Sequence, residues 1–181
     1  MQCYTVRQVC LINQMRKLWE QHVYWTRFFI ISTAASLGDL EAVTARLLQN
    51  PGDFSAALTP FYPAKTVDTF KALFTQHLLI GGDLVNAAKN QQSTKVDETR
   101  KKWYINADEI AKFLADINPC WSKEKWRTML YDHLEMTEKE AILRLNEKYP
   151  KDIHIFETIE NDALKMADYM SCGLIRQFSY R

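Results

Sequence analysis

The chain has 181 residues, of which 47% are hydrophobic and 25% are charged, and its 23 basic and 22 acidic side chains leave a formal net charge of +1. This length suffices for one domain with a sizeable core. The balanced charge provides no basic footprint for a nucleic acid, and no basic block marks an anionic membrane surface. We therefore expect neither a nucleic acid nor a membrane as a partner.

The cysteines are scattered and form no Cys-x-x-Cys pair; they are Cys3, Cys10, Cys120 and Cys172. A domain of this size does not need a disulfide framework, so reduced thiols and a cytoplasmic location are expected. The apolar run at residues 28–37 is shorter than the roughly 20 residues that span a bilayer. It is expected to form part of a core helix.

Long periodic segments with only five glycines and five prolines favour helices over strands. The expected long helices are at about residues 15–37, 66–90, 95–117 and 150–178. Short helices are expected in the two long connections, residues 38–65 and 120–149, the second of which includes a capping-box pattern at Thr137. The predicted fold class is all-α, with four long helices in a ferritin-like bundle and short helices in two long crossovers.

The hydrophobic register of the first long helix becomes regular only at Met15. Residues 1–14 are therefore expected to form an N-terminal extension, either helical or mobile, and residues 15–178 to form a single helical-bundle domain. Within the second long helix, Gly81 and Gly82 together cost about 2 kcal/mol relative to alanine. This pair predicts a kink or the close approach of a neighbouring helix.

His22 and His77 occupy positions of the helical repeat where buried apolar side chains are expected. A buried polar group without a partner costs about 1–3 kcal/mol. The core must therefore place other polar groups, a water molecule or a metal ion beside these two rings. Parallel first and second long helices would bring the two histidines to within about one helical turn of each other along the bundle.

Carboxylates from the other two long helices fall near the same level of the bundle. Glu160 lies on the expected inward seam of the last helix, and the turn near residue 92 places Asp108 opposite His77. Histidines and carboxylates inside a bundle bind iron, manganese or zinc. The candidate metal ligands are His22, His77 and Glu160, with Asp108, Glu109 or His133 as a fourth group.

Other interpretations of these residues stay open. The two copies of Glu-x-x-His that a ferritin-like diiron site uses are missing, so the polar groups could form a hydrogen-bonded histidine–carboxylate network without metal. His133 is also placed to cap the end of a short helix. Arg27 is expected to pair with Glu20 or Asp168. No catalytic residue is assigned. The alternative function is a non-catalytic interaction or structural protein, expected to be dimeric, whose polar core fixes helix packing.

Four stretches resemble a group of small all-helical proteins from Firmicutes such as clostridia and bacilli; they are LWEQHVYWTRFFIIS, WYINADEIAKFL, INPCWSKEKWRTMLYDHLEMT and MADYMSCGLIRQF. The resemblance covers about residues 15–178 and implies a helical fold with no assigned activity. Some members carry the name acetylglutamate kinase, which implies an α/β fold with glycine-rich nucleotide loops. This sequence has neither feature, so the resemblance transfers no kinase chemistry.

Overall fold

The computed structural model describes residues 4–178, and all regular secondary structure in this range is helical. The helices are α1 (Val6–Ala35), α2 (Leu40–Leu47), α3 (Asn50–Leu58), α4 (Ala64–Lys89), α5 (Ser93–Ile117), α6 (Lys123–Leu145) and α7 (Tyr149–Phe178). The all-helical class predicted from the sequence is therefore confirmed. None of these helices combines the length and the apolar character that a bilayer crossing requires.

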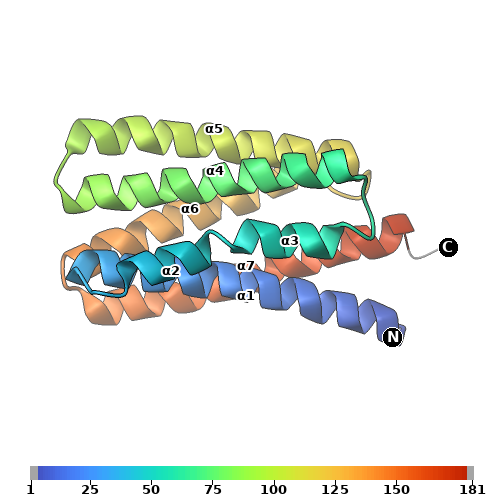
Figure 1. The fold of residues 1–181 in the computed structure, drawn as a ribbon, viewed down its shortest axis with the longest axis horizontal. Helices are drawn as coiled ribbons and strands as arrows, with labels where there is room; N and C mark the ends of the chain where they lie inside the picture. Colours follow the sequence, from blue (N-terminus) through green and yellow to red (C-terminus); the bar gives the residue numbers. More distant parts are fainter. Residues whose placement is uncertain (1–3, 179–181) are drawn as a thin grey trace.

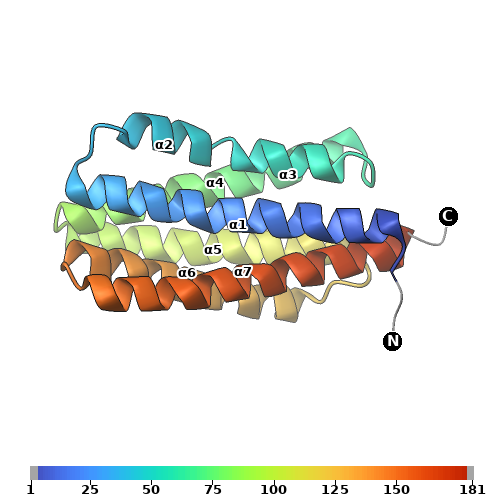
Figure 2. The same cartoon turned by 90° about the horizontal axis from the view of Figure 1, so that it is seen from below.

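The long helices run side by side, and from α4 to α7 each reverses the direction of the one before it (Figure 1). Helices α1, α4 and α6 point one way, whereas α5 and α7 point the other way. The short helices α2 and α3 follow each other along the bundle and return the chain from the end of α1 to the start of α4 (Figure 2). α1 packs on α7, α7 on α6, α6 on α5 and α5 on α4, while α2 contacts α1 and α3 contacts both α1 and α4.

The first long connection contains the two expected short helices, but the prediction for the second was wrong. Residues 123–145 form one continuous helix, α6, and Thr137 lies buried inside it instead of capping a new helix. The apolar stripe of Trp126, Leu130, Leu134 and Ala141 continues through this position in steps of four and seven residues. Burial of that stripe therefore outweighs the local capping signal, and α6 becomes a fifth long helix.

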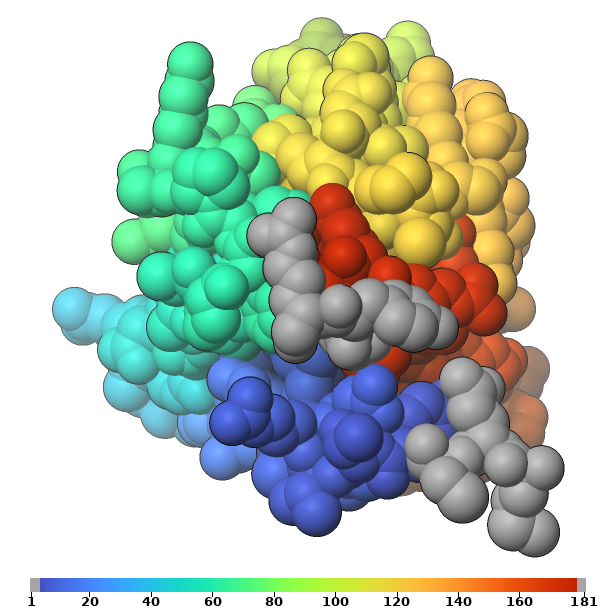
Figure 3. Space-filling view, turned by 90° about the vertical axis from the view of Figure 1, so that its right-hand side faces the viewer, coloured from blue at the N-terminus to red at the C-terminus, as the bar shows by residue number. Residues whose placement is uncertain are grey.

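Helix α1 starts nine residues before the predicted domain boundary. It begins at Val6, where the Thr5 hydroxyl accepts from the Gln8 backbone N–H and the Gln8 side chain accepts from the Thr5 backbone N–H. It then continues without interruption, and Met15 is its first buried residue. These first turns lie on the surface at one end of the bundle (Figure 3). The boundary between an extension and a domain at residue 15 stays a prediction.

The junction between α5 and α6 is held against α7 by an indole. Trp121, which is buried, donates from Nε1 to the Tyr169 carbonyl at 3.2 Å. Its ring occupies the space that a side chain at Gly173 would need, because a Cβ there would lie 1.8 Å from Trp121 Nε1. Ser122 then caps α6 by accepting from the Lys125 backbone N–H. The start of α6 thus depends on a glycine in α7.

We expect Gly173→Ala to destabilise the protein by about 3 kcal/mol or more, at the upper end of the range for overpacked cores, because the indole must move and lose its hydrogen bond. Gly52→Ala is the matched control, since a Cβ at this helical glycine meets nothing within 4 Å. That control should be neutral or more stable by about 0.5–1 kcal/mol. Urea unfolding of both variants measures the difference, and equal stabilities would contradict this account of the junction.

Candidate metal centre

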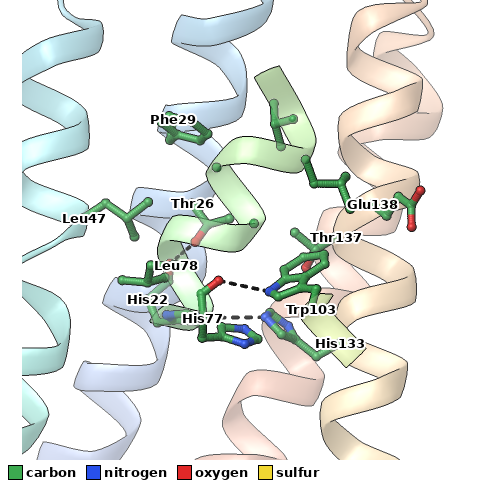
Figure 4. A pocket seen from close by; sticks show the side chains of 14 residues that line it. His22, Thr26, Phe29, Leu47, His77, Leu78, Trp103, His133, Thr137 and Glu138 are labelled. Atoms are coloured by element: carbon green, nitrogen blue, oxygen red, sulfur yellow. Dashed lines mark hydrogen bonds between the residues drawn. The ribbon is translucent and has the colours of Figure 1, made fainter. Parts of the chain in front are cut away.

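Three buried histidines meet inside the bundle, one from each of the helices α1, α4 and α6. His22, His77 and His133 are 1%, 1% and 3% exposed. The Nε2 atoms of His22 and His133 are 3.4 Å apart, and one ring nitrogen from each of the three residues lies within 4.8 Å of the others. The pairwise distances between ring centroids are 5.4–6.2 Å. The close approach of His22 and His133 is visible in Figure 4.

An asparagine fixes the orientation of the His22 ring. The Asn50 amide nitrogen donates to the Leu18 carbonyl at 3.2 Å, so its Oδ1 must be the atom that faces His22 Nδ1 at 3.3 Å. A carbonyl oxygen can only accept, so His22 carries its proton on Nδ1. The lone pair of its Nε2 is therefore free on the side that faces His133 Nε2.

The same arrangement recurs at His77. Asn106 Nδ2 donates to the Leu73 carbonyl at 3.1 Å, and Asn106 Oδ1 lies 3.0 Å from His77 Nδ1. In both cases the amide joins the imidazole to the carbonyl four residues earlier in the same helix. Trp103 Nε1 also donates to the His77 backbone carbonyl at 3.0 Å. His77 is thus held with Nδ1 protonated and Nε2 free to accept a proton or to coordinate a metal ion.

The glycine pair of α4 allows this packing. A Cβ at Gly81 would lie 3.0 Å from the Trp103 ring, whereas one at Gly82 would make an ordinary contact with Phe29 at 3.5 Å. The close helix approach that the Gly81-Gly82 sequence predicts is therefore present at Gly81. It lets the indole reach the His77 carbonyl.

Burial keeps all three imidazoles neutral. Removal from water lowers the pKa of His77 to about 3, with a further contribution from His133, and lowers the pKa of His133 to about 4. Burial, followed by the neighbouring histidines, also holds the pKa of His22 well below its usual range. Neutral imidazoles with free lone pairs are the form of histidine that binds metal ions.

The spacing of the nitrogens suits a tetrahedral metal ion. With metal–nitrogen bonds of 2.0–2.1 Å, two histidine ligands of a tetrahedral zinc ion have nitrogens about 3.3 Å apart. The His22 and His133 Nε2 atoms, at 3.4 Å, already have this separation. The third nitrogen is within 4.8 Å, so a shift of at most about 1.5 Å would bring all three to coordination distance.

The carboxylates predicted as ligands lie elsewhere. Glu160 is half-buried and accepts from the Tyr24 hydroxyl, because Ile159 occupies the inward position of α7 that the sequence analysis gave to Glu160. Asp108 accepts from the Tyr131 hydroxyl at 3.1 Å and pairs with Arg127 at 2.9 Å. Glu109 is exposed. Within residues 4–178 the structure gathers only the three histidines into a group that could hold a metal ion.

The interpretation of His133 as a helix cap was wrong, because α6 continues for 12 residues beyond it, to Leu145. The structure places His133 beside His22 and His77. A short shared pattern could have revealed this role. Each histidine follows a large aliphatic residue by four positions and an acidic or amide residue by one, as in LWEQH (18–22), LFTQH (73–77) and MLYDH (129–133).

A small cavity adjoins the three rings. Its volume is about 30 Å³, and its wall includes all three histidines together with Thr137, Trp103 and the α4 glycines (Figure 4). One water molecule needs roughly 10–15 Å³ of such a cavity, so this one has room for about two. A metal ion bound by the three histidines would therefore have room for a further small ligand.

Arg27 of α1 forms a buried ion-pair network with carboxylates of α6 and α7 that were not predicted from the sequence. Arg27 donates to Asp152 at 2.8 Å and to Glu140 at 2.5 Å, instead of pairing with Glu20 or Asp168. Asp152 is fully buried and also pairs with Arg144 at 3.1 Å. Burial raises the pKa of Glu140 to about 7, which Arg27 partly opposes.

Asp168, the other partner expected for Arg27, binds Arg16 instead, through both carboxylate oxygens at 2.6 and 2.7 Å.

Comparison with models of protein families, with curated proteins and with solved structures finds no match to this chain.

In the metal-free protein, acid should weaken the fold through these histidines. Between about pH 6.5 and 4 the unfolded chain binds protons that the folded chain does not, so the free energy of unfolding falls as the pH falls. Replacing one such histidine, as in His77→Gln, should make the decrease in the free energy of unfolding between pH 6.5 and 5 smaller by about 1.5 kcal/mol. Urea unfolding in the presence of a chelator measures this loss at each pH.

His154→Gln provides the control, because His154 is exposed on α7, with a side-chain exposure of 85%. Its loss of stability with acid should equal that of the unaltered protein. Equal losses for His77→Gln and the unaltered protein would show that His77 does not stay neutral in the fold.

Proposed function

We propose that the protein is a metal-binding helical bundle in which His22, His77 and His133 hold one zinc ion. The observation that supports this most directly is the pairing of two asparagine oxygens with Nδ1 of His22 and His77. These pairs leave the Nε2 lone pairs of His22 and His77 free, in a cluster where one ring nitrogen of each histidine lies within 4.8 Å of the others. Hydrogen-bonded outer partners of this kind orient histidine ligands in metal sites generally.

The ligand set narrows the choice of metal from the iron, manganese or zinc expected from the sequence. Imidazole ligands suit zinc, copper, iron and nickel, whereas manganese favours carboxylates and water. Of the predicted carboxylate ligands, Glu160 is engaged by Tyr24, Asp108 is engaged by Tyr131 and Arg127, and Glu109 is exposed. Three histidines with an open fourth position are typical of catalytic zinc sites. A zinc-bound water in such a site can act as a nucleophile near neutral pH.

The relationship to ferritin-like proteins that we propose is limited to metal ligands carried on the inner faces of bundle helices. A mononuclear site of three histidines takes the place of the dinuclear carboxylate centre of those proteins. We extend the proposal to the Firmicutes proteins that the chain resembles, because His22 and His133 lie within the stretches that carry the resemblance. A cytoplasmic location and a homodimer are part of the same proposal.

The hydrogen bonds of the cluster also support a second candidate, a structural or interaction protein without metal. A His133 ring protonated on Nε2 can donate to the free Nε2 of His22, and the two asparagines satisfy the Nδ1 atoms of His22 and His77. In this case the polar core would only fix the register of the helices. A metal ion and the His133 proton would compete for the same lone pair.

Metal analysis separates the two candidates. We expect the untagged protein, purified without chelators, to contain close to one zinc ion per chain by elemental mass spectrometry. After chelation, added zinc should raise the free energy of unfolding by about 2.7 kcal/mol at a free concentration one hundred times the dissociation constant. His133→Gln should lower zinc affinity by roughly 100-fold or more, since loss of an outer partner alone costs about 10–100-fold.

His154→Gln again serves as the control and should keep the bound metal. A folded protein that contains no metal and gains no stability from zinc, cobalt or iron would favour the structural candidate. Unchanged zinc binding in both His77→Gln and His133→Gln would place the metal elsewhere and overturn the proposal.

A further inference from the structure

The cavity beside the histidines contains a hydroxyl group that has no partner. Buried hydroxyls without a hydrogen bond in residues 4–178 are those of Thr33 and Thr137, and of these only Thr137 lines the cavity. Thr26, on the opposite wall, donates to the His22 carbonyl one turn earlier in its helix, as helical threonines commonly do. Thr137 makes no such bond, so its Oγ1 is available to a ligand.

Thr137 lies one helical turn after His133 on α6. Residues four apart share a helix face and are separated by about 6 Å along the axis. A metal ion at His133 Nε2 would therefore lie about one helical turn from the Thr137 hydroxyl, which lines the same cavity as His133. That distance fits a ligand bound to the metal through one atom and hydrogen-bonded to Thr137 through another.

The charge balance of the site favours an anion. Three neutral histidines leave both positive charges of a divalent ion uncompensated, in an apolar surrounding where that cost is high. Glu138 is the acidic residue of the cavity wall, and its carboxylate points away from the histidine rings (Figure 4). Arg100 binds that carboxylate through Nε at 2.9 Å, which cancels its charge locally.

The volume of the cavity limits the size of the ligand that it can hold. A volume of about 30 Å³ accommodates two water-sized groups, and hence a ligand of two or three non-hydrogen atoms. Gly81 and Gly82 are half-buried and form part of the wall, so this wall is thin where α4 meets the surface. A small ion could enter there without a movement of whole helices.

We propose that the cavity is the binding site of a small triatomic monoanion, which coordinates the metal ion through one end and accepts a hydrogen bond from the Thr137 hydroxyl at the other. This inference rests on the proposed three-histidine metal site and specifies the ligand class of its fourth position. Phosphate, acetate and imidazole, each with four or more non-hydrogen atoms, are too large for the cavity. Thr137 is then a residue that selects and orients the ligand.

The test uses the full chain loaded with cobalt(II), whose visible spectrum reports its coordination, and sodium azide as the triatomic anion. The cobalt content of every sample is measured by elemental mass spectrometry. Azide should change the spectrum of the unaltered protein in a saturable way, whereas imidazole should not. Thr137→Val, which keeps the side-chain shape, should bind cobalt equally well but azide roughly tenfold more weakly. Thr137→Ser should restore azide affinity to within about twofold.

The outcomes separate this inference from the proposed function. Bound cobalt with no spectral response to azide would overturn the anion site and leave the metal site intact. Equal azide affinity in the unaltered protein and Thr137→Val would overturn the role of Thr137. Absence of bound cobalt would overturn the metal site and the anion site together. If Thr137→Val does not fold, Thr137→Ala replaces it, because a smaller side chain opens the cavity instead of straining it, and the same tenfold weakening is expected.

Discussion

Two hydrogen-bonded asparagine–histidine pairs fix the alignment of the helices around the site, because an imidazole N–H buried in an apolar interior without an acceptor is costly. Asn50 ties α3 to α1, and Asn106 ties α5 to α4. Each amide contacts both the ring and the carbonyl four residues before it. A slip of either helix pair by one residue would break both bonds at once. Apolar packing supplies the driving force, and these polar contacts select one alignment of the helices.

The antiparallel pair α6 and α7 lacks an asparagine–histidine contact like those that join α3 to α1 and α5 to α4. His133 approaches His22 through Nε2, and no asparagine among the described residues holds its Nδ1. Its ring is therefore less constrained than the rings of His22 and His77. In a site where the nitrogens lie within 4.8 Å, one adjustable ligand allows the other two to stay in place while the coordination sphere closes.

Helical periodicity predicted most of the fold and the inward positions of His22 and His77, because both follow from which residues share a helix face. The prediction failed where the outcome depends on neighbouring helices. The capping pattern at Thr137 is a local signal that burial of α6 overrides. Glu160 and Ile159 differ by one position, or about 100° of rotation, which the apolar pattern of one helix does not resolve. The partners of Arg27 lie more than 100 residues away, on two other helices.

The distribution of charge gives the histidine cluster its chemical character. The buried and half-buried acidic side chains of α6 and of the start of α7 are matched by arginines: Glu138 by Arg100, and Glu140 and Asp152 by Arg27. None of these carboxylates belongs to the group of potential ligands formed by the described residues. The protein thus buries strong ion pairs close to a site that itself consists of neutral donors. A cation entering that site would find lone pairs but no counter-charge from the protein, so solvent must supply the anion that completes it.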